Sequence, residues 1–356
     1  MYEIKKQPED FIVREVTEKG KVLKEDENYF FDENSSGKHL ICVLVKKNWD
    51  THQAFKRISK WLHISKNSIG FAGTKDKKAL TTQLISLTGV KKEEAEKVSL
   101  KDIKLIPLKY SNERISLGNL KGNWFKIKVY TNEKPRQADK VPNFFGIQRF
   151  GKTRPITHLV GEKIVKGKPE EAVMIYLTKT FESEKEEVKK ARKKLAEEKD
   201  FKKALDYFPL YLKYERTLIN HLAEYEGDYI GALRVLPKTL KMMFVHAYQS
   251  YLFNKMLEHA IKNNMEVKEL PLVGFNSKLE KWQEEILEKE EVKPEDFRIK
   301  LLPELSSPGF MRKAFITPID LRIIEQKEGE VTVEFFLEKG AYATTVIDFL
   351  FDVKRA

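Results

Sequence analysis

Apolar residues form short continuous or alternating runs toward both ends of the chain, a pattern typical of β-strands. The run Leu40–Val45 is apolar at every position and predicts a strand buried on both faces, and Leu84–Leu87 predicts another. Further extended segments are predicted at residues 1–15, 103–110, 114–120, 123–130, 312–318, 330–338 and 342–353.

Apolar residues at helical spacing predict helices elsewhere in the chain. One should begin after an N-cap at Asp50 or Thr51 and end near Leu62. Its apolar face, which we expect in the core, comprises Ala54, Phe55, Ile58, Trp61 and Leu62. Other predicted helices begin at Pro169 or cover residues 90–96, 182–198, 244–260 and 280–291.

The mostly helical section between two strand-rich ends predicts an α+β protein in which one domain is inserted into another. Residues 1–160 and 307–356 should form a discontinuous domain, and residues 161–306 an inserted, mainly helical α/β domain.

The segment Gly70–Gln83 carries the most suggestive chemistry. Its two glycines permit backbone conformations that a Cβ would resist. Asp76 lies among three lysines, and nearby cations favour the ionised form of a carboxylate, which can act as a covalent nucleophile. The alternative is an ordinary surface turn rich in Lys, Asp and Gly. A P-loop is excluded because Asp76 stands where phosphates would lie.

A second segment, Pro142–Gly151, contains three phenylalanines together with Asn143, Gln148 and Arg149. An aromatic loop with an arginine can stack on an unpaired base and hold a phosphate. The alternative is a hydrophobic plug with a surface arginine.

These segments resemble the TruD-type tRNA pseudouridine-13 synthases. The family signature Ala-Gly-x-Lys-Asp, followed by Ala-x-Thr-x-Gln, matches Ala72–Gln83. Four more family blocks occur in the family's order, at Lys5–Glu15, Lys121–Phe125, Pro142–Gly151 and Leu337–Val346. The helical middle of the chain has no motif that can be matched residue by residue.

The resemblance implies a pseudouridine-synthase-type catalytic domain with a mixed, largely antiparallel sheet flanked by helices, and an inserted domain beside it. RNA would lie in the cleft between them. The implied reaction converts uridine 13 of tRNA to pseudouridine, after base flipping brings the uridine to a buried aspartate.

The same resemblance assigns roles to individual residues. Asp76 would be the nucleophile or the base that starts glycosidic cleavage. The implied substrate-binding residues are Lys5, Phe11, Asn143, Phe145, Arg149 and Tyr342. Among these, the aromatic rings would form walls of the uracil pocket. The family commonly has phenylalanine where Tyr342 stands, and tyrosine keeps the stacking face while adding a hydroxyl.

Composition supports an anionic partner. The formal net charge is +12, so nucleic acid is the first candidate and an anionic membrane surface the second. The single cysteine, Cys42, excludes a disulfide framework or a cysteine-rich zinc site within one chain, and the seven histidines show no metal-binding spacing. We expect no metal and no cofactor. The sequence has no apolar signal segment or membrane-spanning run, so we expect a cytoplasmic protein, by default monomeric.

Three other functions remain open from the residues. An RNA-binding protein of the same fold would form no product. A methyltransferase would need a cofactor site, but no Gly-rich loop between a strand and a helix supplies one. A structural protein would have no affinity for RNA.

The net charge of +12 predicts that tRNA binding weakens steeply with salt. Each neutralised phosphate releases counterions, so log affinity should fall against log salt with a slope of roughly −0.7 to −0.9 per contact. A salt titration of tRNA affinity measures this slope. An affinity that stayed flat would contradict the electrostatic argument.

Overall fold

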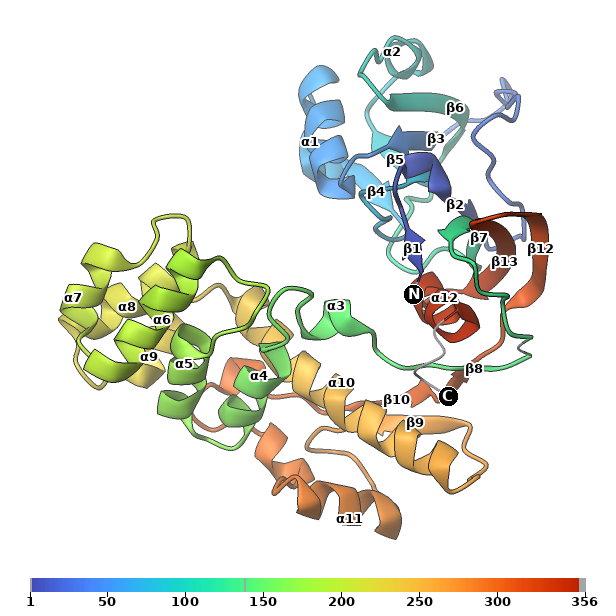
Figure 1. The fold of residues 1–356 in the computed structure, drawn as a ribbon. Helices are drawn as coiled ribbons and strands as arrows, with labels where there is room; N and C mark the ends of the chain where they lie inside the picture. The colour runs from blue at the N-terminus through green and yellow to red at the C-terminus, as the bar shows by residue number, and fades with distance from the viewer. Residues whose placement is uncertain (1, 138, 352–356) are drawn as a thin grey trace. The chain divides into compact units, whose positions relative to one another are not determined.

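The computed structural model describes residues 2–137 and 139–351 and divides the chain into two compact units (Figure 1). The first unit comprises residues 1–141 and 316–356, and the second comprises residues 142–315. The second is therefore inserted into the first. The division falls at 141/142 and 315/316 rather than at the expected 160/161 and 306/307.

The first unit is built on one mixed sheet. Its strands follow the order β12-β13-β7-β2-β5-β3-β6, with β1 paired to β7 and β4 paired to β5. β2 and β5 run parallel and the other pairs are antiparallel. The bounds are β1 Glu3–Ile4, β2 Phe11–Val16, β3 His39–Lys47, β4 Ile69–Phe71, β5 Leu80–Thr88, β6 Ile103–Ser111, β7 Gly122–Tyr130, β12 Ile319–Lys327 and β13 Glu330–Glu338. This confirms the predicted α+β class with a largely antiparallel sheet.

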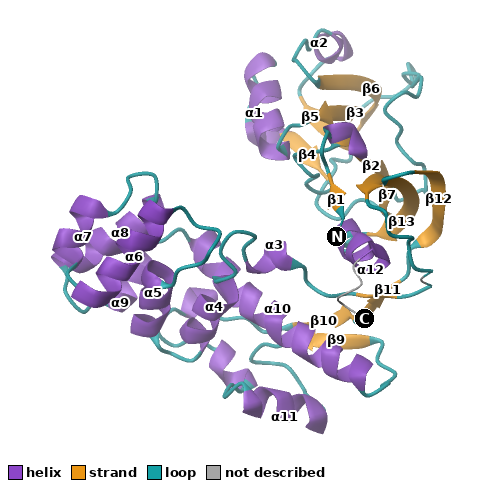
Figure 2. Cartoon of the chain, viewed as in Figure 1, coloured by secondary structure: helices purple, strands orange, loops and turns teal. Residues whose placement is uncertain are grey.

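In the described part of this unit, three α-helices pack on the sheet (Figure 2). They are α1 Thr51–Trp61, α2 Lys92–Glu96 and α12 Ala343–Phe351. The α1 helix begins as predicted, since the Asp50 side chain accepts a hydrogen bond from the Gln53 backbone N–H at 3.0 Å. α1 and α2 share a core with β3, β5 and β6, whereas α12 shares one with β2, β7 and β13.

The prediction that Trp61 belongs to the core is wrong. Ala54, Phe55 and Ile58 of α1 are buried as expected, but Trp61 is 37% exposed. It is the last residue of the helix and lines a surface pocket with Leu62 and Leu100.

Two strand predictions are also wrong. Residues 114–120 form an irregular loop, in which hydrogen bonds from the Arg114 guanidinium to the Asn67 and Ile69 carbonyls replace a strand ladder. The segment predicted as a strand at 342–353 contains helix α12 instead, and residues 352 and 353 lie outside the described part. The β-branched residues of this segment favour a strand, but burial of one helical face outweighs that local preference. Strands β4 and β12 were not predicted.

The second unit is mainly helical. Its helices are α3 Ile147–Phe150, α4 Thr157–Val165, α5 Pro169–Thr178, α6 Glu186–Glu198, α7 Phe201–Tyr207, α8 Lys213–Glu224, α9 Tyr229–Arg234, α10 Lys238–Lys262 and α11 Lys281–Lys289. Strands β9 Glu269–Leu272 and β10 Phe310–Lys313 form an antiparallel pair. β8 Val141–Pro142 and β11 Phe315–Ile316 pair where the chain crosses between the units.

The core of the second unit explains why the domain boundary differs from the predicted one. The α10 helix buries Phe244 and Tyr248 and packs against α4, so a boundary at 160/161 would cut through α4. Phe145 belongs to the same core, with its ring edge-on to Phe253 at a centroid distance of 5.6 Å. The aromatic block that the sequence assigned to the catalytic domain therefore folds with the inserted unit.

Candidate active site

Residues 72–79, here called the Asp76 loop, connect two antiparallel strands of the first unit. β4 and β5 pair from Ile69↔Leu87 to Phe71↔Ile85, which fixes the start of the loop on the sheet. The Asp76 side chain is 45% exposed, so the expectation of a buried aspartate is wrong. A carboxylate in this position can be reached by a ligand without any opening of the fold.

Lys5 is the ion-pair partner of Asp76. Its Nζ lies 2.5 Å from Asp76 Oδ1 and 3.8 Å from the centroid of the Phe11 ring. Lys5 has a φ of 61°, a left-handed conformation that is uncommon outside glycine. Phe11 is buried and lies edge-on to Phe125. The structure thus brings together three of the residues that the resemblance singled out, with Lys5 between the carboxylate and the ring.

A second lysine, Lys46, binds the backbone of the Asp76 loop. It is fully buried, and its Nζ donates to the Asp76 carbonyl at 2.9 Å and to the Trp49 carbonyl at 2.8 Å. Burial lowers the pKa of Lys46 to about 8, against the opposing effect of the Asp76 and Asp50 charges. Lys46 therefore holds the catalytic candidate by its main chain and leaves its carboxylate exposed.

A third lysine, Lys75, anchors the loop through a buried ion pair with Glu15. Lys75 Nζ lies 2.6 Å from Glu15 Oε2, while Glu15 Oε1 accepts from the Leu84 backbone N–H at 3.0 Å. The Thr51 hydroxyl accepts from the Lys75 N–H at 3.0 Å and donates to the Lys75 carbonyl at 3.1 Å. The loop is thereby attached to β2, β5 and the first turn of α1.

The start of the loop is held as well. Gln83 donates from Nε2 to the Gly73 carbonyl at 3.1 Å, and the Gly118 N–H donates to the Ala72 carbonyl at 2.8 Å. These bonds fix the loop backbone on rigid elements, which is the arrangement that a preorganised catalytic group needs.

Tyr342 also belongs to the first unit, immediately before α12. Its backbone carbonyl accepts from the Thr345 N–H at 3.1 Å, and the residue is 53% exposed. An aromatic ring with this exposure can stack on a base.

The remaining residues implied by the resemblance lie in the second unit. Asn143 is buried: its Nδ2 donates to the Lys313 carbonyl at 2.9 Å, and its Oδ1 accepts from Arg312 Nη2 at 2.6 Å. Its backbone N–H donates to the Ala314 carbonyl at 2.8 Å. Asn143 therefore ties the two crossing segments of the chain together.

Two arginines lie near the Phe145 ring. It is 6% exposed, and its ring centroid is 4.2 Å from the Arg312 guanidinium and 5.3 Å from that of Arg149. Arg149 also donates from Nε to the Ser250 hydroxyl at 2.9 Å. This arrangement orients two cations on one aromatic ring.

Sequence reasoning assigned no functional role to Lys46, Glu15, Thr51 or Arg312. Glu15 and Lys46 are charged residues within otherwise buried strands, and that pattern is a usable signal, because a charge in such a position needs a partner. Thr51 and Arg312 act through contacts distant in sequence, and nothing in their local sequence indicates those contacts.

Residues 2–137 and 139–351 contain neither a metal-holding cluster nor a membrane-spanning helix. No group of three or more His, Cys, Asp or Glu side chains is placed to hold a metal ion there. No helix in that part of the chain combines the length and the apolar character needed to cross a membrane.

Comparison with known proteins gives consistent matches over almost the entire chain. A family model described as tRNA pseudouridine synthase D (TruD) matches residues 2–274 and 267–348. A relative from Archaeoglobus fulgidus is 38% identical over 97% of this chain and 93% of its own, and one from Methanosarcina acetivorans is 35% identical over 97% and 91%. Both carry the name "Probable tRNA pseudouridine synthase D".

A solved structure is similar in fold. A crystal structure described as that of the "Putative tRNA pseudouridine synthase D (TruD) from Methanosarcina mazei" superposes with a TM-score of 0.82 at 34% identity. The match covers 98% of this chain and 93% of that one.

The lowered pKa of Lys46 predicts a distinct pH dependence of stability. In the folded protein Lys46 loses its proton at about pH 8, whereas in the unfolded chain it keeps the proton up to about pH 10.5. The unfolded state binds more protons in this window, so the free energy of unfolding should rise with pH relative to that of Lys46→Met. Denaturant unfolding of both proteins between these pH values measures the difference.

Lys47→Met is the matched control. The exposed Lys47 pairs with Glu9, and the hydrogen bond between them raises the pKa of Lys47. The contribution of Lys47 to folding stability therefore falls only at pH values above the ordinary lysine pKa. If the free energies of unfolding of wild type and Lys46→Met differed by a constant amount over this pH range, the lowered pKa of Lys46 would be contradicted.

Phe145 can be tested by separating volume from aromaticity. Phe145→Ala should lose about 3–5 kcal/mol of stability because it empties a buried site. Phe145→Leu should recover most of that stability, but turnover on tRNA should stay low, since the ring is lost. Thermal unfolding and pseudouridine yield are the two measurements. Full turnover by Phe145→Leu would show that Phe145 only fills the core.

Proposed function

The chain belongs to the tRNA pseudouridine synthase D family, and we propose that it isomerises uridine 13 of tRNA to pseudouridine with Asp76 as the catalytic residue. One observation carries the proposal: Asp76 presents an exposed carboxylate from a loop whose backbone is bound by buried side chains. A surface turn of the same composition would not need a buried ion pair and a buried lysine to hold it.

The reaction is an internal exchange of bonds. The glycosidic bond between the ribose carbon and the uracil nitrogen breaks, and a bond from the same ribose carbon to a uracil carbon forms. That uracil carbon loses a proton and the nitrogen gains one, so uridine and pseudouridine have the same composition. Asp76 starts the exchange as a nucleophile or as a base, and no electron donor or acceptor is required.

Lys5 orients the catalytic group in this scheme. Its ammonium group lies 2.5 Å from Asp76 Oδ1 and fixes the orientation of the carboxylate. The Phe11 ring supports Lys5 from the other side, at 3.8 Å. The Phe11 ring is itself buried, so little of its surface is open to a base. We therefore infer that Phe11 acts in the uracil pocket together with Lys5, which it supports.

The flipped base needs an aromatic surface. Tyr342 has the most exposed ring among the implied pocket residues and is the proposed stacking partner of the uracil. In the second unit, Phe145 positions Arg149 and Arg312 for phosphate contacts, and Asn143 fixes Arg312.

Asp76→Asn tests the mechanism because it removes the charge with little change in volume. The variant should fold normally and bind tRNA at least as well as wild type, since a negative charge near phosphates is gone. It should form no detectable pseudouridine in single-turnover reactions with excess enzyme.

If Asp76 only stabilises the loop, the outcome is the reverse: stability falls by about 0.5–2 kcal/mol and turnover survives. Substantial pseudouridine made by pure Asp76→Asn, free of wild-type enzyme and of deamidation, would rule out the proposed role. Tight tRNA binding without product by the wild type would favour an RNA-binding protein of the same fold.

A further inference from the structure

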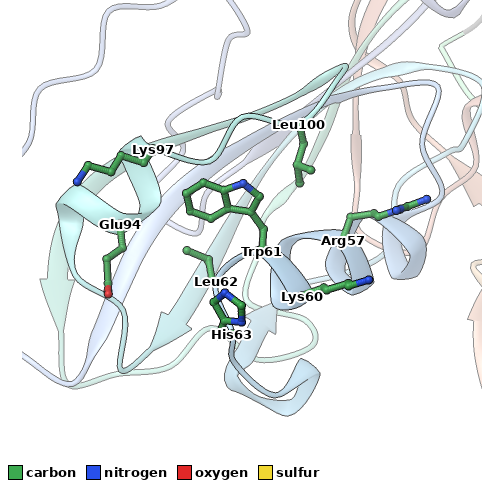
Figure 3. Close-up of a pocket in the computed structure, with 8 residues that line it drawn as sticks. All are labelled: Arg57, Lys60, Trp61, Leu62, His63, Glu94, Lys97 and Leu100. Atoms are coloured by element: carbon green, nitrogen blue, oxygen red, sulfur yellow. The ribbon is translucent and has the colours of Figure 1, made fainter.

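A surface pocket of about 630 Å³ lies in the first unit, at the end of α1 (Figure 3). It is formed by the last turn of α1, the residues that follow it, and α2 with the segment after it. Its lining consists of Arg57, Lys60, Trp61, Leu62, His63, Glu94, Lys97 and Leu100. We call it the Trp61 pocket.

Trp61 gives the pocket its aromatic surface. It is 37% exposed and is more exposed than Trp49, Trp124 and Trp282, the other tryptophans of the chain. Figure 3 shows its indole at the centre, with Leu62 and Leu100 near it. A large aromatic side chain that remains accessible between apolar neighbours offers a platform for another flat ring.

The rim of the pocket is cationic. Arg57, Lys60 and Lys97 line it with one carboxylate, Glu94, whose Oε2 accepts the Lys91 backbone N–H at 2.7 Å. Across the described residues, no carboxylate lies within 4.0 Å of the charged nitrogens of these three cations. Their charge is thus available to an external anion.

The α1 helix links this pocket to the Asp76 loop. The first helical residue, Thr51, is hydrogen-bonded to Lys75, and the last, Trp61, lies in the pocket. Eleven residues at 1.5 Å each make the helix about 16 Å long. The helix contains no acidic residue, and its exposed Lys56, Arg57 and Lys60 place positive charge on its second half, next to the pocket.

We propose that the Trp61 pocket binds an unpaired nucleotide of the same tRNA whose uridine reaches Asp76. The base stacks on Trp61, and the flanking phosphates lie against Arg57, Lys60 and Lys97. An unpaired nucleotide is required because the faces of paired bases are covered by their neighbours in the helix. This inference rests on the proposed function, since it assigns the pocket to the same RNA.

The chemistry favours RNA over a protein partner. The accessible apolar surface centres on one indole, with Leu62 and Leu100 only half-buried beside it, so a protein would bury little apolar area there. A nucleotide combines a flat ring and a negative charge, and the pocket supplies a partner for each.

Tryptophan fluorescence and tRNA affinity provide the test, with unmodified tRNA as the probe. Wild-type emission should fall on binding because a stacked base quenches the indole. In Trp61→Leu most of that quenching should disappear, and the affinity should weaken roughly 5- to 150-fold. Trp61→Phe retains a stacking face and should keep most of the affinity. Trp61 is the last residue of α1 and lies outside the sheet core, so the melting temperatures should stay close to that of wild type.

The cationic rim has its own test. Replacing Arg57, Lys60 and Lys97 together with glutamine should reduce the salt slope of tRNA binding by roughly 0.7 for each phosphate that is no longer neutralised. The control has the same charge change on exposed lysines of the second unit, Lys190, Lys193 and Lys202. An equal reduction in the control would show that only net charge matters and would overturn the proposal.

Failure of this inference can be told apart from failure of the proposed function. Asp76→Asn should show the same Trp61-dependent quenching although it makes no product. If wild type neither binds nor modifies tRNA, the proposed function fails. If wild type modifies tRNA but Trp61→Leu keeps both the quenching and the affinity, only the nucleotide assignment is wrong.

Discussion

Two buried lysines anchor the Asp76 loop while the Asp76 carboxylate stays exposed, and the proposed chemistry depends on this arrangement. Lys46 donates to the Asp76 carbonyl, and Lys75 pairs with Glu15. A buried ion pair that loses one partner costs about 3–5 kcal/mol, so these contacts resist displacement of the loop. With its backbone fixed in this way, the carboxylate can be positioned by a single further contact, the ammonium group of Lys5.

The same contacts explain how distant parts of the first unit support one residue. Glu15 belongs to β2, Lys46 to β3 and Thr51 to α1, and each reaches the loop from a different element. Because these elements also form the sheet and its helical cover, the geometry of the loop follows from the stability of the whole unit. The helix that holds the loop at its first turn carries the Trp61 pocket at its last, so both proposed RNA contacts depend on α1.

Sequence patterns predicted the parts of the fold that depend on local rules. The N-cap at Asp50, one of the two predicted positions, and the helix predicted over residues 244–260 were both found. Patterns failed where distant contacts decide the outcome. Trp61 fits the apolar stripe of its helix, but the sheet core ends before it, and the segment after Tyr342 became helical because one helical face is buried.

The candidate site, too, could be predicted from the sequence only in part. The resemblance identified Asp76, Lys5 and Phe11, and the structure places these three together. It could not show that Asn143 and Phe145 fold with the inserted unit, because their contacts with Arg312 and Phe253 join segments far apart in the sequence. Motif order indicates shared function, whereas domain membership is decided by packing.

The most direct test of the account is to map pseudouridine at nucleotide resolution in unmodified tRNA incubated with the purified protein alone, in the presence of a metal chelator. We predict conversion of uridine 13 without any added cofactor. Conversion of other uridines with uridine 13 left intact would contradict the substrate assignment. Intact uridine throughout, in tRNA that the protein demonstrably binds, would contradict the proposed activity itself.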